Sequence, residues 1–426
     1  MSVKFEKKSS LKGDFTIPGD KSISHRAIML GALSFGDTVI HHFLEADDCI
    51  NTIKCFQKMG ISIEEVDNDI IVHGRGLHGL SAPERALDVG NSGTTIRLLS
   101  GILAAQPFNT EISGDNSIVR RPMARIIDPL SLMGANIKSK YNNDCAPLLI
   151  SPSELHGIDY STPVASAQVK SSILFAGLYA DGLTRITEPY QSRNHTELMM
   201  SAFGADIKCN YNVTEIRPVS SLHSCEITIP GDISSAAYFI TAALITKDSE
   251  ITIRNVGMNP TRNGFIDVVL SMGADIEILN ARGGIEPTAD LVVRSSKLHG
   301  ITLEGEIIPR ALDEIPILTV LACYADGETV IKDAGELKYK ESNRIEVMVE
   351  NLTKMGANIQ ATDDGMIIQG GYPLHGSIIG TKYDHRIAMS FAVAALGASG
   401  KTEIIGSECV NISYPGFYDD LKSLFQ

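Results

Sequence analysis

The chain has 426 residues, of which 43% are hydrophobic and 21% charged, and this ordinary globular composition excludes a disordered protein. Its 37 Lys and Arg against 51 Asp and Glu give a formal net charge of −14, which argues against partners such as nucleic acid or a membrane surface. The length predicts about two to three domains.

The first residues, MSVKFEKKSS, lack the apolar core of a signal peptide, and the longest apolar stretches are too short to span a bilayer. Seven scattered cysteines, odd in number and without CxxC spacing, favour free thiols over disulfides or a zinc site. The histidines form no HExxH motif. We therefore expect a cytoplasmic protein without a metal site.

A repeat of about 70 residues runs through the chain. Each copy has an apolar helix-like stretch, a small turn and a strand start, and the aligned positions are Thr38, Thr110, Thr184, Ser249, Thr329 and Thr402. In the first five copies a second helix then ends in a glycine suited to a left-handed C-cap, before an alternating strand: Gly60, Gly134, Gly204, Gly273 and Gly356. The sixth copy ends at FYDDLKSLF, so its final strand is expected to be missing.

The chain also has a longer repeat, because PGDKS at 18–22 recurs as PGDIS at 230–234. It predicts an α/β fold of two similar globular domains with three repeats each. An N-terminal strand in 1–19 would join 231–426, and 20–230 would form the other domain. The chain would then pass between the two domains twice, and this predicts a hinge and a cleft that opens and closes. One continuous solenoid is the alternative.

Polar residues stand directly before each apolar helix: GDKSISHR (19–26), GNSGTTIR (90–97), SAQVKSS (166–172), GDISS (231–235), DEIP (313–316) and DHR (384–386). Helix N-termini bind anions, although Gly, Ser and Asp there also cap helices, and capping explains GDISS fully. Capping does not explain the recurrence of Lys21, Arg26, Gln168, Lys170 and Arg386. If the helices point inward, these side chains converge.

Further basic residues cluster in VRRPMAR, SRNHTE and KYKESNR, which contain Arg121, Arg193, Lys340 and Arg344. Any one of them is equally consistent with a solvated surface charge, but the whole set in an acidic protein favours binding of phosphates and carboxylates. Two acids accompany them, Asp313 and Glu341. Each is consistent with structural pairing or with general acid–base chemistry.

Nucleotide-binding and hydrolase motifs find no support. GRGLHG at 74–79 matches GxGxxG by letters, but no helix opens on its last glycine. The chain contains no GxxxxGK[ST] and no GxSxG.

Together, PGDKSISHR, GNSGTTIRL, RRPMAR, SAQVKSS, DEIP, KESNRI and DHRIAMSFA resemble the 5-enolpyruvylshikimate-3-phosphate synthases of the enolpyruvyl transferase family. The motifs occur in order from residue 18 to about 391, so the resemblance covers essentially the whole chain. It implies two domains of three βαβαββ units, with helix N-termini facing a central cleft. The implied reaction moves the enolpyruvyl group of phosphoenolpyruvate to the 5-hydroxyl of shikimate 3-phosphate and releases phosphate. It requires no cofactor and no metal.

The resemblance also implies roles for individual residues. The residues implied to bind shikimate 3-phosphate are Lys21, Ser22, Arg26, Ser166, Gln168, Arg193, Asp313 and Lys340. The residues implied to bind phosphoenolpyruvate are Lys21, Gly93, Arg121, Gln168, Arg344 and Arg386. Asp313 would take the proton of the attacking hydroxyl, and Glu341 with Lys21 would move the proton of the methylene group. The substrates are the only partners expected, and a monomer is expected.

The chain departs from the family pattern in one place, and two indicators disagree. Some members carry a Lys before the C-terminal Tyr-Pro pair, where this chain has Asn411, Ile412 and Ser413. SAQVK and RNHTE match the second sequence class of the family, whereas Gly93 is associated with members sensitive to glyphosate. Two alternatives stay open: a UDP-N-acetylglucosamine enolpyruvyl transferase, and a non-catalytic anion-binding protein on the same scaffold.

Overall fold

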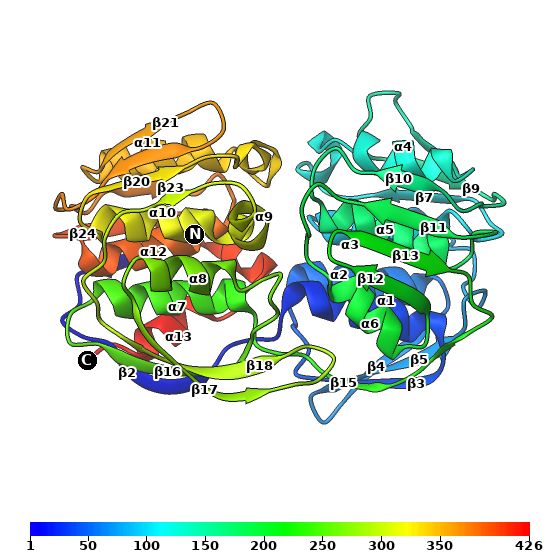
Figure 1. Ribbon diagram of the computed structural model, residues 1–426, viewed down its shortest axis with the longest axis horizontal. Helices are drawn as coiled ribbons and strands as arrows, with labels where there is room; N and C mark the ends of the chain where they lie inside the picture. The colour runs from blue at the N-terminus through cyan, green and yellow to red at the C-terminus, as the bar shows by residue number, and fades with distance from the viewer. The chain divides into compact units, whose positions relative to one another are not determined.

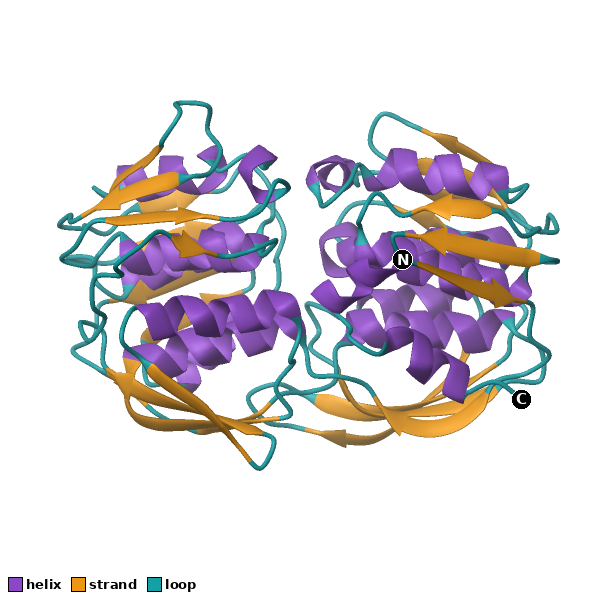
Figure 2. Cartoon of the chain, turned by 180° about the vertical axis from the view of Figure 1, so that it is seen from behind, coloured by secondary structure: helices purple, strands orange, loops and turns teal.

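A computed structural model describes residues 1–426, which divide into two compact units. The N-terminal unit is Gly19–Ile229, and the C-terminal unit is Met1–Pro18 with Pro230–Gln426. The division expected from the repeated Pro-Gly-Asp sites lies one residue further along at each crossing. In each unit the strands run along the outside and helices lie between them (Figure 1; Figure 2).

The N-terminal unit contains three sheets, each built from a parallel edge strand, a central strand and a hairpin. In the order of hydrogen bonding, the first sheet contains β14 (Leu222–His223), β3 (Ser34–His41), β5 (Asp69–Arg75) and β4 (Ser62–Val66). The second contains β6 (Leu87–Asp88), β7 (Thr110–Ser113), β9 (Leu148–Ser151) and β8 (Asn136–Ser139). The third contains β10 (Asp159–Ser161), β11 (Thr184–Thr187), β13 (Val213–Arg217) and β12 (Asp206–Asn210). The short strand β15 (Glu226–Thr228) also pairs with β3, so the end of the unit completes its first sheet.

Six helices alternate with these strands. They are α1 (Lys21–Leu33), α2 (Asp47–Lys58), α3 (Gly93–Leu103), α4 (Ala124–Leu132), α5 (Ala167–Gly177) and α6 (His195–Ala202). Each repeat therefore has the order βαβαββ, which confirms the predicted fold class.

The C-terminal unit follows the same plan. Its first sheet contains β2 (Lys12–Thr16), β16 (Glu250–Gly257), β18 (Thr288–Arg294) and β17 (Asp275–Arg282). The second contains β19 (Thr302–Leu303), β20 (Glu328–Ile331), β22 (Met366–Gln369) and β21 (Asn358–Ala361). The third contains β23 (Ile378–Gly380), β24 (Lys401–Ile405) and β1 (Ser2–Glu6). Its helices are α7 (Ile233–Ile245), α8 (Gly264–Ser271), α9 (Ile307–Ala311), α10 (Ile315–Tyr324), α11 (Arg344–Lys354), α12 (His385–Gly397) and α13 (Phe417–Ser423).

The N-terminal segment differs from the single strand expected there. It forms two strands in two different sheets: β1 pairs antiparallel with β24, and β2 pairs parallel with β16. The expectation that the sixth repeat lacks its final strand is therefore only half right, because β1 fills one hairpin position and leaves a sheet of three strands.

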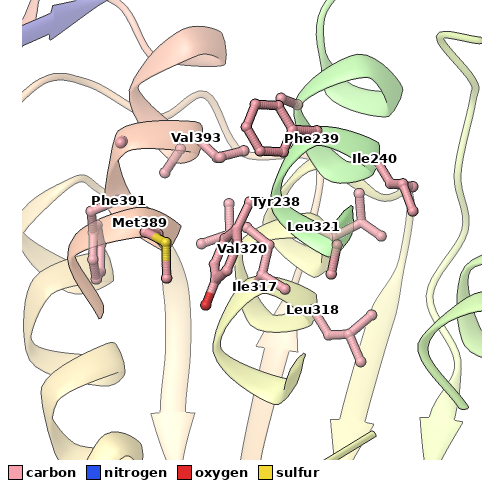
Figure 3. Close-up of a cluster of buried hydrophobic side chains, with 14 of the residues drawn as sticks. Tyr238, Phe239, Ile240, Ile317, Leu318, Val320, Leu321, Met389, Phe391 and Val393 are labelled. Atoms are coloured by element: carbon pink, nitrogen blue, oxygen red, sulfur yellow. The ribbon is translucent and has the colours of Figure 1, made fainter. Parts of the chain in front are cut away.

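The first helix of each repeat is the apolar one, and a helix that is apolar all round must be buried. In the C-terminal unit these helices are α7, α10 and α12, and their side chains meet in one core (Figure 3). Tyr238 and Phe239 from α7, Leu321 from α10 and Phe391 from α12 are at most 1% exposed. This packing brings the polar residues at the helix N-termini close together.

The five predicted C-cap glycines all have the left-handed backbone, with φ between 87° and 96°. Four of them face a histidine that the repeat analysis missed, in the order His156, His223, His299 and His375. Each of these histidines donates its backbone N–H to the carbonyl of the C-cap residue of the second helix in its repeat, for example His156 to Met133 O at 2.9 Å. The motif satisfies the exposed helix end.

Candidate active-site clusters

In the N-terminal unit, hydrogen bonds join the N-terminal turns of α1, α3 and α5. Gln168 of α5 donates from Nε2 to Thr94 Oγ1 of α3 (3.2 Å), and Arg26 of α1 donates to Ser171 Oγ of α5 (2.9 Å). Asp20, Ser92 and Ser166 cap the three helices through their side chains. The three helix starts therefore form one cluster of N–H groups and cations, which we call the N-terminal cluster.

Arg26 is 3% exposed and firmly held in this cluster. Its guanidinium donates to Thr196 Oγ1 of α6 (2.6 Å), to Ser171 Oγ and to the backbone oxygen of Ser22 (2.8 Å). These acceptors are neutral oxygens on three different segments. They fix the orientation of the side chain.

Lys21 is the first residue of α1, and its Nζ lies 3.2 Å from Asp48 Oδ2 of α2. Ser22 follows it on the same turn. One turn further, His25 is fully buried and accepts or donates a 2.7 Å hydrogen bond with Thr52 Oγ1. Burial, with Lys21 and Arg26 nearby, lowers the pKa of His25 well below its usual value, so this histidine adds no further positive charge.

Gly93 opens α3 beside two guanidinium groups. Arg121 is held by Asn91 Oδ1 (2.8 Å) and Ser117 Oγ (2.9 Å). A Cβ placed on Gly93 would lie 2.9 Å from Arg121 Nη1 and 3.2 Å from Arg97 Nη1. A side chain at this position would therefore push the two guanidinium groups away from the helix start.

Arg97 is a residue to which the sequence motifs assigned no role, although it ends the quoted segment GNSGTTIR. Its Nη1 donates to Gln168 Oε1 at 2.6 Å. Arginine can only donate hydrogen bonds, so Oε1 is the atom of the Gln168 amide that faces Arg97. The Nε2 group then faces the other partners. Gln168 thus presents a donor, which suits an anionic ligand.

Two further predicted ligands precede helices. Ser166 precedes α5, and Arg193 is half-buried in the segment that leads into α6. Lys170, which the sequence grouped with the anion-binding residues, is instead 2% exposed and ion-paired with Glu188 and Glu197. That expectation was wrong because the spacing of Lys170 places it on the inner face of α5.

The C-terminal unit holds the second group of predicted residues, which we call the C-terminal cluster. Asp313 lies in the turn before α10 and is 9% exposed. Its Oδ1 is 3.3 Å from Lys340 Nζ and 3.4 Å from Arg344 Nη1, and its Oδ2 is 3.7 Å from Arg386 Nη2. One carboxylate therefore faces three cations.

Arg344 begins α11 and is 1% exposed. It lies 2.9 Å from Asp384 Oδ2 and 2.5 Å from Glu341 Oε2. Burial opposes its charge, but Asp384 and Glu341 outweigh burial and raise the pKa of Arg344 above its usual value. Burial likewise opposes the charge of Arg386, and Asp313 among its neighbours raises the pKa.

Twelve of the thirteen predicted site residues lie in these two clusters, and the thirteenth, Arg193, lies in the segment that leads into α6. The N-terminal cluster contains Lys21, Ser22, Arg26, Gly93, Arg121, Ser166 and Gln168, and the C-terminal cluster contains Asp313, Lys340, Glu341, Arg344 and Arg386. No group of three or more His, Cys, Asp and Glu side chains is arranged to hold a metal ion. None of the helices has the length and apolar character needed to cross a membrane.

Fold and clusters together define a class: an α/β protein of five βαβαββ repeats and a sixth with one strand fewer, whose buried cations and carboxylates suit small anionic substrates. A sequence model of the family described as EPSP synthase (3-phosphoshikimate 1-carboxyvinyltransferase) matches residues 5–421. The chain belongs to this family, which confirms the resemblance seen in its motifs.

Individual relatives agree with this assignment. The chain is 54% identical over 425 residues to the 3-phosphoshikimate 1-carboxyvinyltransferase of Thermoanaerobacter sp. strain X514, and the match covers 100% of both proteins. It is 52% identical to that of Geobacillus thermodenitrificans, over 98% of this chain and 97% of the relative. The solved structure of EPSP synthase from Acinetobacter baumannii matches with a TM-score of 0.88 at 44% identity, over 100% of this chain and 98% of that chain.

Proposed function

We propose that the N-terminal and C-terminal clusters are the two halves of one active site. The reaction is that of the family: the enolpyruvyl group of phosphoenolpyruvate moves to the 5-hydroxyl of shikimate 3-phosphate, and phosphate is released, in the shikimate pathway to chorismate. Addition gives a tetrahedral intermediate and elimination resolves it. The observation that carries the proposal is the Asp313 carboxylate, held among three cations that anionic substrates would also bind.

The N-terminal cluster would bind most of the acceptor. Lys21, Ser22, Arg26, Ser166, Gln168 and Arg193 supply cations, hydroxyl groups and an amide donor for its phosphate, carboxylate and hydroxyl groups. The hydrogen bonds of Arg26 to Thr196 and Ser171 support this role, because they hold the guanidinium in one orientation. Asp313 and Lys340 would reach the same substrate from the C-terminal cluster.

Phosphoenolpyruvate would bind to Lys21, Gly93, Arg121, Gln168, Arg344 and Arg386. The close approach of Arg121 to Gly93 and the Nε2 donor of Gln168 support this assignment. Arg344 and Arg386 now face Asp313, so an arriving carboxylate or phosphate would compete for them. Asp313 would lose part of its positive surroundings and become a stronger base for the acceptor hydroxyl.

Glu341 and Lys21 would manage the second proton. A proton must reach the methylene carbon during addition and leave the resulting methyl group during elimination. Glu341 contacts Arg344, one of the proposed phosphoenolpyruvate ligands, and its carboxylate would therefore lie next to that substrate. No step calls for a metal or an organic cofactor.

The activity is tested by phosphate release from phosphoenolpyruvate, with shikimate 3-phosphate or with UDP-N-acetylglucosamine as acceptor. We expect turnover with the first acceptor only. Turnover with the second alone would overturn the assignment, and binding without any turnover would indicate a non-catalytic anion-binding protein.

The joining of the two clusters needs a separate test. If both substrates bridge the units, saturating shikimate 3-phosphate should reduce the radius of gyration in small-angle scattering. Identical dimensions with and without this ligand would contradict the hinge. A cytoplasmic location, supported by seven free thiols, and a monomeric state complete the proposal.

A further inference from the structure

Lys170 is a buried lysine that the substrate assignments leave unused. It lies one turn into α5, and its Nζ is 2.8 Å from Glu188 Oε2 and 2.7 Å from Glu197 Oε1. Burial opposes its charge, but Glu197 and Glu188 outweigh burial and raise the pKa of Lys170. The lysine is therefore a permanent internal cation.

Glu188 has a second set of contacts, and these reach two segments with proposed acceptor ligands. Its Oε1 accepts the backbone N–H of Ser166 (3.1 Å), and its Oε2 accepts that of Ser192 (3.2 Å). Lys170 Nζ donates to the backbone oxygen of Ser192 (3.4 Å). Ser166 is the cap of α5, and Ser192 directly precedes Arg193.

Glu197 provides an internal comparison. It is 4% exposed, nearly as buried as Glu188 at 2%, and it faces the same lysine nitrogen from α6. It forms no hydrogen bond to Ser166 or to Ser192. Both glutamates therefore neutralise Lys170, but Glu188 alone connects it to the two ligand-bearing segments.

We propose that Lys170 and Glu188 are positioning residues for the acceptor, because the pair holds Ser166 and the Ser192–Arg193 segment in the geometry that binds shikimate 3-phosphate. The lysine supplies the counter-charge that a buried carboxylate needs. The inference rests on the proposed function, since it takes Ser166 and Arg193 to be acceptor ligands.

The test compares Glu188→Gln with Glu197→Gln. Each change removes one of the two counter-ions of Lys170, but only Glu188→Gln replaces an oxygen that accepts from Ser166 or Ser192. We expect Glu188→Gln to raise the KM for shikimate 3-phosphate by about tenfold, while kcat and the KM for phosphoenolpyruvate change by less than about threefold. For Glu197→Gln the acceptor KM should stay within about twofold.

Equal acceptor KM values for the two variants, or an unchanged KM in Glu188→Gln, would overturn the proposal. Thermal unfolding of both variants separates lost stability from lost positioning, and Lys170→Met should raise the acceptor KM as Glu188→Gln does. If Glu188→Gln does not fold, Glu188→Asp, which keeps both oxygens on a shorter side chain, is compared in the same way. Arg26→Met tests the proposed function itself: an effect there without one in Glu188→Gln rejects only the present inference.

Discussion

The first sheets of the two units carry the same pattern of ion pairs with different bases. In the N-terminal unit, His41 lies between Asp69 and Glu226, with contacts of 2.8 and 2.9 Å, and His73 lies between Asp37 and Glu64. In the first sheet of the C-terminal unit, two arginines have the corresponding cross-strand pairing. Arg254 lies between Asp290 and Asp14, and Arg294 contacts Glu250 and Glu277.

The equivalence extends to strand register: His73 pairs with Asp37 as Arg294 pairs with Glu250. A duplicated architecture has therefore kept its geometry while its charges diverged. The two proposed active-site clusters also differ. The arginines of the C-terminal cluster contact carboxylates, and Arg26 and Arg121 of the N-terminal cluster donate to hydroxyl, amide and backbone oxygens. We infer that the C-terminal unit supplies both carboxylates proposed for proton transfer, and that the N-terminal unit supplies most of the proposed acceptor ligands.

The largest effect should follow from removing the acids of the C-terminal cluster. Asp313→Ala and Glu341→Ala should each fold and lose about 10²–10⁴-fold in kcat, the usual scale for a general acid or base. Steady-state kinetics with both substrates saturating measures the loss. Turnover close to that of the parent in both variants would reject their proton-transfer roles.

A smaller effect, on a different constant, should follow from the N-terminal cluster. Arg26→Met removes charge-assisted hydrogen bonds worth about 1.5–3 kcal/mol. The KM for shikimate 3-phosphate should rise by roughly 10- to 100-fold, with a smaller change in kcat. Arg185→Met, which changes an exposed arginine paired with Glu215 in the same unit, is the control and should leave this KM unaltered. Equal effects of the two changes would mean that Arg26 is only structural.

Gly93→Ala should disturb phosphoenolpyruvate binding by a moderate amount. The new Cβ would press on Arg121 and Arg97, and misfits of this kind amount to about 1–3 kcal/mol. We expect a raised KM for phosphoenolpyruvate and a larger relative increase in the inhibition constant of glyphosate, which is longer than the substrate. Both constants are measured at fixed shikimate 3-phosphate, and equal relative increases would contradict the steric argument.

The smallest effect concerns stability and pH. Hydrogen bonds to Asp69 and then Glu226 raise the pKa of His41, and those to Asp37 and then Glu64 raise the pKa of His73. A raised pKa in the folded state stabilises the protein fully below about pH 6.5, the unfolded value, and the gain is lost as pH rises through the folded pKa.

At pH 6 the double variant His41→Gln/His73→Gln should therefore be less stable than the parent, by at most about 1 kcal/mol per exposed pair. At pH 9 the two proteins should be equally stable. Arg254→Gln/Arg294→Gln is the matched control in the C-terminal unit. Its loss in melting temperature should be the same at both pH values, because arginine stays charged. A loss that depends equally on pH in both double variants would contradict the comparison.

Much of this architecture could be predicted from the sequence because it repeats. Glycine C-caps and apolar helices recur at regular spacing, and they indicated six α/β repeats. The two strands of the N-terminal segment could not be separated, because β1 and β2 join different sheets through pairing that leaves no local signal. Lys170 was misjudged and Arg97 was passed over, because sequence spacing does not show which side chain faces a buried glutamate or a ligand amide.

The central claim, that the C-terminal unit holds the proposed bases and the N-terminal unit most of the proposed acceptor ligands, is tested most directly by steady-state kinetics of Arg26→Met and Asp313→Asn in parallel. Asn keeps the size of Asp313 and removes its basicity. Arg26→Met should raise the KM for shikimate 3-phosphate far more than it lowers kcat, and Asp313→Asn should lower kcat by at least about 10²-fold, more than it changes either KM. Losses of the same size in the same constant for both variants would contradict the division.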